Sequence, residues 1–164
     1  KFMTREDRDT AEDLFQIAYI SESVLADEPN EAAQSLQSIA ERSHRWNGKH
    51  HVTGVLLFSG SHFGQIIEGP SSEVIDLYAT ICTDPRHASI NQLSAQPILQ
   101  RDFADWSTAL LDVDSNSMGS LRDVHASVDT LYATRHGISL VNLMQEWLAR
   151  KEQSMPYFRR VRRH

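Results

Sequence analysis

The chain has 164 residues, 40% of them hydrophobic and 23% charged, with a formal net charge of −6. These values are typical of a globular protein with a real core, and the negative charge argues against non-specific nucleic-acid binding. No apolar run approaches the roughly 18 residues that a membrane span needs. The first residues, KFMTREDRDT, lack the apolar region of a secretory signal, so we expect a cytoplasmic protein. The single cysteine, Cys82, excludes an internal disulfide.

The first half of the chain predicts a strand, a helix and a second strand. Residues 14–21 alternate apolar and aromatic side chains as a strand does. Asn30 is a suitable cap for a helix that runs to about Trp46. The buried stripe of that helix follows helical spacing and comprises Leu36, Ile39, Ala40 and Ser43, extended by Asn47. A second strand is expected over 52–60, followed by a hairpin turn.

The stretch HFGQIIEGP, residues 62–70, predicts a buried strand closed by a Gly-Pro turn. Phe63, Gln65 and Ile67 share one face of this strand. A glutamine amide carries two donor hydrogens and an acceptor oxygen, which are costly to leave unpaired on a dry face. Gln65 therefore needs a polar partner, which could be protein, water or a ligand.

The next elements complete a recognisable order. Ser71 is a suitable cap for a second helix, which Pro85 ends, and its buried face comprises Val74, Leu77, Tyr78 and Ile81. A fourth strand is expected within 90–100 and a fifth around 106–112. The first six elements are βαββαβ, the ferredoxin-like arrangement of an α+β protein, with a fifth strand added. In that topology strands one and three are neighbours beneath both helices, which sets Tyr19 beside Gln65.

The remaining residues predict a helix pair over 118–133 and 138–150. Their apolar stripes are Leu121, Val124, Val128 and Leu131 in the first helix, and Leu140, Leu143, Met144, Trp147 and Leu148 in the second. We expect this pair to cover the other face of the sheet, whose apolar residues we predict to be Leu14, Ala18, Ile20, Gly54, Leu56, Phe58 and Ile66. The predicted organisation is a lead-in (1–13), a sensor-sized domain (14–112), and a helical cap with a basic tail (113–164).

Five stretches together resemble the BLUF family, the flavin-binding sensors of blue light. They are YIS (19–21), RWNGKHHVTGVLLF (45–58), FGQIIEGP (63–70), DPRH (84–87) and RDFADW (101–106). The resemblance covers about residues 14–112 in order. It implies a ferredoxin-like fold with the flavin between the two helices, over strands one and three. FAD is the usual family ligand, and FMN is the alternative.

The resemblance also implies roles for particular residues. Tyr19 and Gln65 match the photoactive pair, in which proton-coupled electron transfer from Tyr19 through Gln65 rearranges the hydrogen bonds. The residues that match flavin contacts are Asn47 at the carbonyl edge of the ring, Arg86 and His87 on its other side, and Ser43 and Ile39 facing the same pocket. Trp106 and Thr108 match the signal relay of the fifth strand, with Thr108 where the family often has methionine. Trp46 stands where a smaller residue is usual, and we expect it to stack at the flavin edge.

The predicted function is a short, stand-alone blue-light photoreceptor with no enzymatic activity of its own. We expect it to signal through an unidentified downstream protein or a change in self-association as a homo-oligomer, without membrane or nucleic-acid partners. The alternatives are a redox flavoprotein and a flavin-free ferredoxin-like interaction module. His50 and His51 are adjacent, so their side chains diverge and we expect no metal site.

Overall fold

The computed structural model describes residues 13–25, 29–58, 60–105, 109–112, 140–142, 144–145 and 148–149. Seven elements follow one another in the order β1 (Leu14–Ser23), α2 (Pro29–His50), β2 (Thr53–Phe58), β3 (His62–Pro70), α3 (Ser71–Cys82), β4 (His87–Pro97) and β5 (Ala109–Asp112). None of the described helices is both long and apolar enough to cross a membrane.

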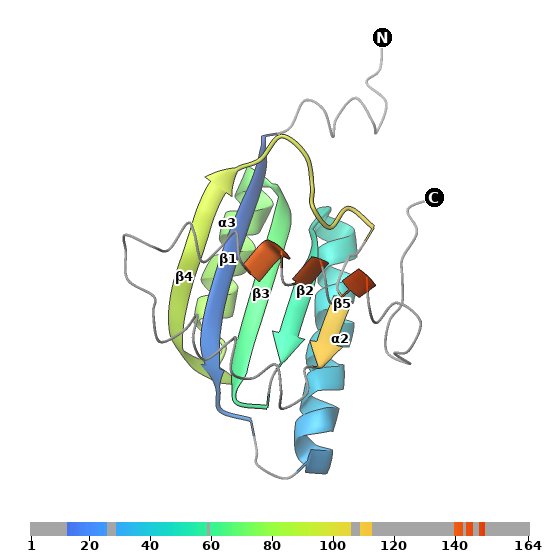
Figure 1. Ribbon diagram of the computed structural model, residues 1–164, viewed down its shortest axis with the longest axis vertical. Helices are drawn as coiled ribbons and strands as arrows, with labels where there is room; N and C mark the ends of the chain where they lie inside the picture. The colour runs from blue at the N-terminus through green and yellow to red at the C-terminus, as the bar shows by residue number, and fades with distance from the viewer. Residues whose placement is uncertain are drawn as a thin grey trace.

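The strands form one sheet in the order β4-β1-β3-β2-β5. All neighbours are antiparallel except β2 and β5, which run parallel. Helices α2 and α3 lie together on one face, and the described pieces of 140–149 lie on the other (Figure 1). The predicted ferredoxin-like core with an added fifth strand is confirmed.

The pairing of β1 with β3 sets the two central polar residues side by side. Tyr19 is opposite Gln65, and Ile17 is opposite Ile67. Because residues two apart in a strand share a face, Phe63, Gln65 and Ile67 all point toward the helices. Ile17 and Ile67 pack there with Val74 of α3. The predicted neighbourhood of Tyr19 and Gln65 is therefore correct.

Strand β2 corrects the prediction for the other face of the sheet. Leu56 is opposite Gln65, and Gly54 is opposite Ile67, so both lie on the helix side, as does Phe58. Val55 and Leu57 lie on the opposite face instead. Every residue of β2 is buried, so hydrophobicity alone does not indicate which set faces the helices.

Helix α2 extends beyond both predicted ends. It begins at Pro29, one residue before the predicted cap, and it continues past Trp46 to His50. His51 then adopts a left-handed backbone with φ of 58°, and Val52 N–H donates to the Asn47 carbonyl oxygen at 3.0 Å. This is the hydrogen bond of a Schellman-type helix end, in which His51 occupies the left-handed position that glycine usually takes. Asn47 therefore lies within the helix.

The other boundaries differ by smaller amounts. Ser71 is the first residue of α3 rather than its cap, because Pro70 occupies the cap position and no side chain caps the helix. Strand β4 begins at His87, earlier than predicted, and the described part of β5 is Ala109–Asp112. Strand β3 has the predicted bounds.

The second face of the sheet carries the largest buried cluster. Its members come from β1, β2, β3, β4, the segment before β5 and the C-terminal part: Ala18, Ile20, Val55, Leu57, Ile66, Leu93, Phe103, Leu140, Met144 and Leu148. The prediction that residues 138–150 cover this face is thus confirmed for Leu140, Met144 and Leu148. The predicted helix 118–133 and the side chains of Leu143 and Trp147 lie outside the described residues.

Candidate functional site

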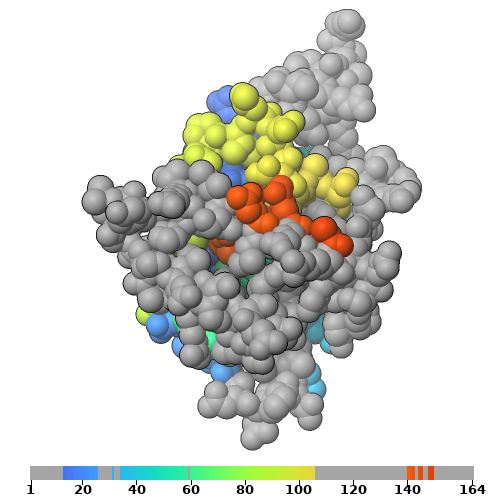
Figure 2. Space-filling model, in the orientation of Figure 1, coloured from blue at the N-terminus to red at the C-terminus, as the bar shows by residue number. Residues whose placement is uncertain are grey.

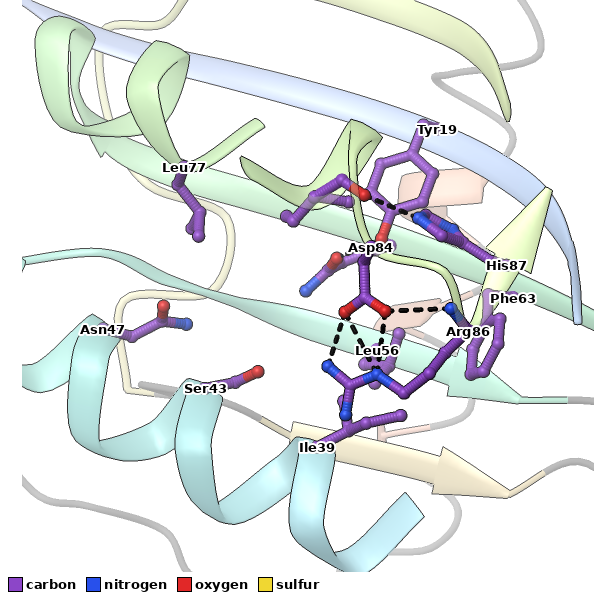
Figure 3. A pocket seen from close by; sticks show the side chains of 12 residues that line it. Tyr19, Ile39, Ser43, Asn47, Leu56, Phe63, Leu77, Asp84, Arg86 and His87 are labelled. Atoms are coloured by element: carbon purple, nitrogen blue, oxygen red, sulfur yellow. Dashed lines mark hydrogen bonds and ion pairs between the residues drawn. The ribbon is translucent and has the colours of Figure 1, made fainter. Parts of the chain in front are cut away.

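A pocket of about 530 Å³, including its open mouth, lies between α2 and α3 above the centre of the sheet (Figure 3). The lining residues are Tyr19, Ile39, Ser43, Asn47, Leu56, Phe63, Gln65, Leu77, Ile81, Asp84, Arg86 and His87. All seven residues predicted to contact a ligand are among them.

Tyr19 and Gln65 form a hydrogen-bonded pair at the floor of the pocket. The Tyr19 hydroxyl donates to Gln65 Oε1, and the two residues are 3% and 7% exposed. Burial is the main cause of a raised pKa at Tyr19, so the phenol keeps its proton across the ordinary pH range. Since Tyr19 engages the amide oxygen of Gln65, the amide nitrogen is the group that Gln65 can offer as a donor to another partner. The pair therefore offers a donor to a ligand above it.

Helix α2 supplies one wall of the pocket through residues one turn apart. Ile39, Ser43 and Asn47 recur at i, i+4 and i+8, so they lie on one face of the helix. Figure 3 shows the three side chains pointing into the pocket from the same side. Asn47 is buried, with 3% of its surface exposed. A hydroxyl and an amide thus stand beside an apolar side chain along one edge of the cavity.

An ion pair that sequence reasoning missed lies in the pocket. Arg86 Nε donates to Asp84 Oδ1 at 2.9 Å, and Arg86 Nη2 donates to Asp84 Oδ2 (Figure 3). The hydrogen bond from Arg86 is the largest cause of a lowered pKa at Asp84. Asp84 opens the DPRH motif, two residues before Arg86, and this spacing was the available signal. The pair keeps both charges at the pocket wall.

His87 is held in one orientation by two partners. Its Nδ1 lies 2.7 Å from Ser21 Oγ, and its Nε2 lies 2.7 Å from the Ile81 carbonyl oxygen. A carbonyl oxygen only accepts, so Nε2 carries a hydrogen. Nδ1 of the neutral ring is then the acceptor for the Ser21 hydroxyl. These two partners hold the His87 ring beside Tyr19, with the two ring centroids 6.0 Å apart.

The apolar part of the lining was only partly predicted. Leu77 and Ile81 were assigned to the buried face of α3, and Phe63 to the face of Gln65, without a role in the pocket. Leu56 was assigned to the wrong face of the sheet. Trp46 stacks on His50, with ring centroids 3.8 Å apart, and it does not line the pocket. The pocket lining does not support the expectation that Trp46 stacks at the flavin edge, which stays a prediction.

Trp106 and Thr108, the predicted signal relay, lie outside the described residues. Within the described part of the chain, no group of histidine, cysteine or acidic side chains is suited to hold a metal ion. The pocket chemistry instead suits a flat aromatic ligand. Ile39, Leu77 and Ile81 offer apolar contact to its faces, while the amide, hydroxyl and charged side chains of the lining offer hydrogen bonds to its polar edges. The isoalloxazine ring of a flavin has this character, so the residues present fit that group.

Comparison with known proteins gives the same family as the motifs. The family model "BLUF: Sensors of blue-light using FAD" matches residues 14–109. The chain is 41% identical over 87 residues to the "Blue light- and temperature-regulated antirepressor BluF" of Escherichia coli, covering 53% of this chain and 21% of that protein. It is 32% identical over 105 residues to "Photoactivated adenylate cyclase subunit beta" of Euglena longa, covering 64% of this chain and 12% of that protein.

A solved structure, the dark state of the BLUF protein BlrB, has the same fold. Its TM-score is 0.58 at 28% identity, and the match covers 81% of this chain and 98% of that one. The curated relatives are much longer than the matched region, which spans about a fifth of the first and less of the second. The similarity therefore concerns the sensor region of those relatives.

Proposed function

Because the chain belongs to the BLUF family, the sensors of blue light that use FAD, we propose that Tyr19 and Gln65 are its photoactive pair. The observation that carries this proposal is the buried hydrogen bond between the Tyr19 hydroxyl and Gln65 Oε1 at the floor of the pocket. The tyrosine and the glutamine satisfy each other only in part, because the Tyr19 hydroxyl engages the amide oxygen and leaves the amide nitrogen for another partner. A ligand with an acceptor at its edge completes the arrangement.

The remaining pocket residues hold the ligand. Asn47 and Ser43, which line the pocket from α2, would hold one polar edge of the ring, and Arg86 and His87, which line it after α3, would hold the other side. Ile39 contacts the ring face. FAD is the flavin proposed, in keeping with the family description.

A bound flavin supplies the absorption of blue light and, once excited, a strong oxidant. Tyr19 would give an electron to the excited flavin, and its hydroxyl proton would pass to the Gln65 amide oxygen, which already accepts the hydrogen bond. When electron and proton return, the amide is left with its donor and acceptor exchanged, by rotation or by tautomerisation. Gln65 then presents a different hydrogen-bonding group to the pocket, and the absorption spectrum reports this change.

The output proposed is a protein–protein interaction and not an enzymatic reaction. Residues 14–112 form the sensor, and residues 113–164 carry the output surface toward a downstream protein or a second copy of the chain. Trp106 and Thr108, next to β5, are the proposed relay between them. A cytoplasmic location is part of this proposal.

Absorption spectroscopy tests the proposal. The purified protein should be yellow, release FAD on denaturation, and shift its flavin absorption to the red under blue light with recovery in darkness. Gln65→Leu should retain flavin and lose the red shift. Gln92→Leu, the same substitution at an exposed position of the outer strand β4, should behave as the wild type. A normal red shift in Gln65→Leu would refute the role of the pair. A colourless protein would favour the flavin-free interaction module, and a yellow protein without a light-induced shift would favour a redox flavoprotein.

A further inference from the structure

Glu68 is a fully buried acid on the sheet face opposite the pocket. Gln16 of β1 and Thr53 of β2 are its partners across the two neighbouring strands. Gln16 Nε2 donates to Glu68 Oε2 at 3.0 Å, and Thr53 Oγ1 lies 3.5 Å from Glu68 Oε1. One carboxylate therefore joins three adjacent strands.

Residues 101–103, between β4 and β5, close over this carboxylate, and we call them the hook. The backbone N–H of Asp102 donates to Glu68 Oε2 at 3.1 Å, and that of Phe103 donates to Oε1. Arg101 adds three hydrogen bonds: from Nη1 to Thr53 Oγ1 (3.0 Å) and to the Glu68 carbonyl oxygen (3.2 Å), and from Nη2 to the His51 carbonyl oxygen (2.7 Å). The hook is thus fastened to β3 by both the side chain and the backbone of Glu68.

The hydrogen-bonding set around Glu68 suits an ionised carboxylate. Its three N–H partners, from Gln16, Asp102 and Phe103, can only donate. Burial raises the pKa of Glu68, and the hydrogen bonds from these three groups act against that rise. Hydrogen bonds to a charged acceptor are stronger and more directional than those to a neutral one. The hook is therefore held by strong, geometrically demanding contacts.

The hook also reaches the C-terminal part of the chain. Phe103 is 2% exposed and packs in the second-face cluster with Leu140, Met144 and Leu148. In Figure 2 the described atoms of 140–149 (orange-red) lie against those of the segment that precedes β5 (yellow). A displacement of the hook would therefore change the packing of the C-terminal segment directly.

We propose that Glu68 is a positioning residue that couples β3, the strand of Gln65, to the hook and through Phe103 to residues 140–149. This inference rests on the proposed function, because it takes the change at Gln65 as its origin. Gln65 and Glu68 are three residues apart, about 10 Å along the strand, and point to opposite faces of the sheet. A shift of β3 that accompanies the amide change moves the Glu68 carboxylate relative to the two hook N–H groups, whose hydrogen bonds allow little change in geometry.

Glu68→Gln tests the coupling in the flavin-loaded full chain. The new amide has nearly the same shape, but its NH₂ group faces a donor, so one hook contact is lost. We expect the flavin spectrum and the amplitude of the light-induced red shift to stay within a few per cent of wild type. Hydrogen exchange in darkness should become at least tenfold faster in a peptide covering 99–105. The lit-minus-dark exchange difference in 140–149 should fall by at least half.

Glu73→Gln is the matched control, because Glu73 lies on α3 in an ion pair with His50 at the surface. This variant should keep the wild-type rate of hydrogen exchange in 99–105 in darkness and the wild-type lit-minus-dark exchange difference in 140–149. A thermal melt of each protein distinguishes a general loss of stability from a specific loss of coupling, because a general loss would raise exchange equally in dark and light. If Glu68→Gln does not fold, Arg101→Gln removes a second set of hydrogen bonds that hold the hook and should also lower the lit-minus-dark exchange difference in 140–149.

Two outcomes would overturn the inference in distinguishable ways. If the wild type shows a red shift and Glu68→Gln, or Arg101→Gln in its place, keeps the full lit-minus-dark difference in 140–149, the coupling through Glu68 is wrong and the proposed function stands. If the wild type shows no red shift, the proposed function fails and the coupling fails with it.

Discussion

Substitution of Gly54 by alanine should destabilise the protein through a collision at the centre of the sheet. A Cβ at position 54 would lie 2.0 Å from the Ile66 carbonyl oxygen and 3.2 Å from Ile67 Cα, both in the backbone of β3. Cβ atoms essentially never approach other heavy atoms within 3.0 Å, so the two backbones must separate by the difference, 3.0 − 2.0 = 1.0 Å. Such a shift stretches the ladder bonds next to Gly54. Overpacking of this kind typically costs about 1–3 kcal/mol.

Thermal unfolding measures the effect, since about 1 kcal/mol corresponds to roughly 2–4 °C in a chain of this size, which gives a loss of roughly 2–12 °C. Gly48→Ala is the matched control. Gly48 is an exposed residue inside α2, and a Cβ there would meet nothing within 4 Å. Alanine is favoured over glycine in a helix by about 0.5–1 kcal/mol, so the control should be more stable than wild type. Equal stability of Gly54→Ala and wild type would refute the close contact between β2 and β3.

Three further predictions concern the pocket. Tyr19→Phe should retain flavin and lose the normal red-shifted state, as transient absorption would show; formation of that state at native yield would require another donor. Asn47→Ala should weaken flavin binding by about 1–3 kcal/mol, the cost of an unpaired buried partner, so the variant should lose more flavin than the wild type on gel filtration. Unchanged retention would remove Asn47 from the ligand contacts. Asp84 has a lowered pKa because of Arg86, so its contribution to stability is present above its ordinary pKa and is lost as the pH falls through the folded value. Denaturation of wild type and Asp84→Asn across pH should therefore show a difference of about 0.2–1 kcal/mol at neutral pH that disappears in acid; a difference that persists in acid would contradict this.

The central strands could be predicted from the sequence because their signals are local and complete. The Gly-Pro pair of HFGQIIEGP marks where the strand ends, although α3 follows it directly without the predicted turn, and the glutamine marks the face that needs a polar partner. The ferredoxin-like order then places Tyr19 opposite Gln65 without further information, and the observed register agrees. The helical spacing of Ile39, Ser43 and Asn47 likewise placed them on one pocket wall.

The predictions were wrong where the sequence pattern does not specify which face of a strand a residue lies on or where a helix ends. All residues of β2 are apolar or small and buried on both faces, so only the register with β3 assigns Leu56 to the pocket. The end of α2 was missed because a histidine, His51, occupies the left-handed position that glycine usually takes. Asp84 meets Arg86 through the geometry of a local turn, and Glu68 meets Asp102 from a segment distant in sequence. Neither contact can be predicted from hydrophobic periodicity.

The outer strand β4 constrains how this sheet can meet another molecule. Among the described strands it has a neighbour on one side only, β1, and that pairing shifts register twice, between Ala18 and Tyr19 and between Ile20 and Glu22. Ser89 has a positive φ of 51°, and Pro97 lacks an N–H at the end of the strand. A strand interrupted in this way is a poor template for edge-to-edge addition of a second sheet. Self-association at the β4 edge would therefore use side-chain surfaces, where a light-dependent change in packing can alter affinity, in preference to a continuous backbone ladder, which would be insensitive to it.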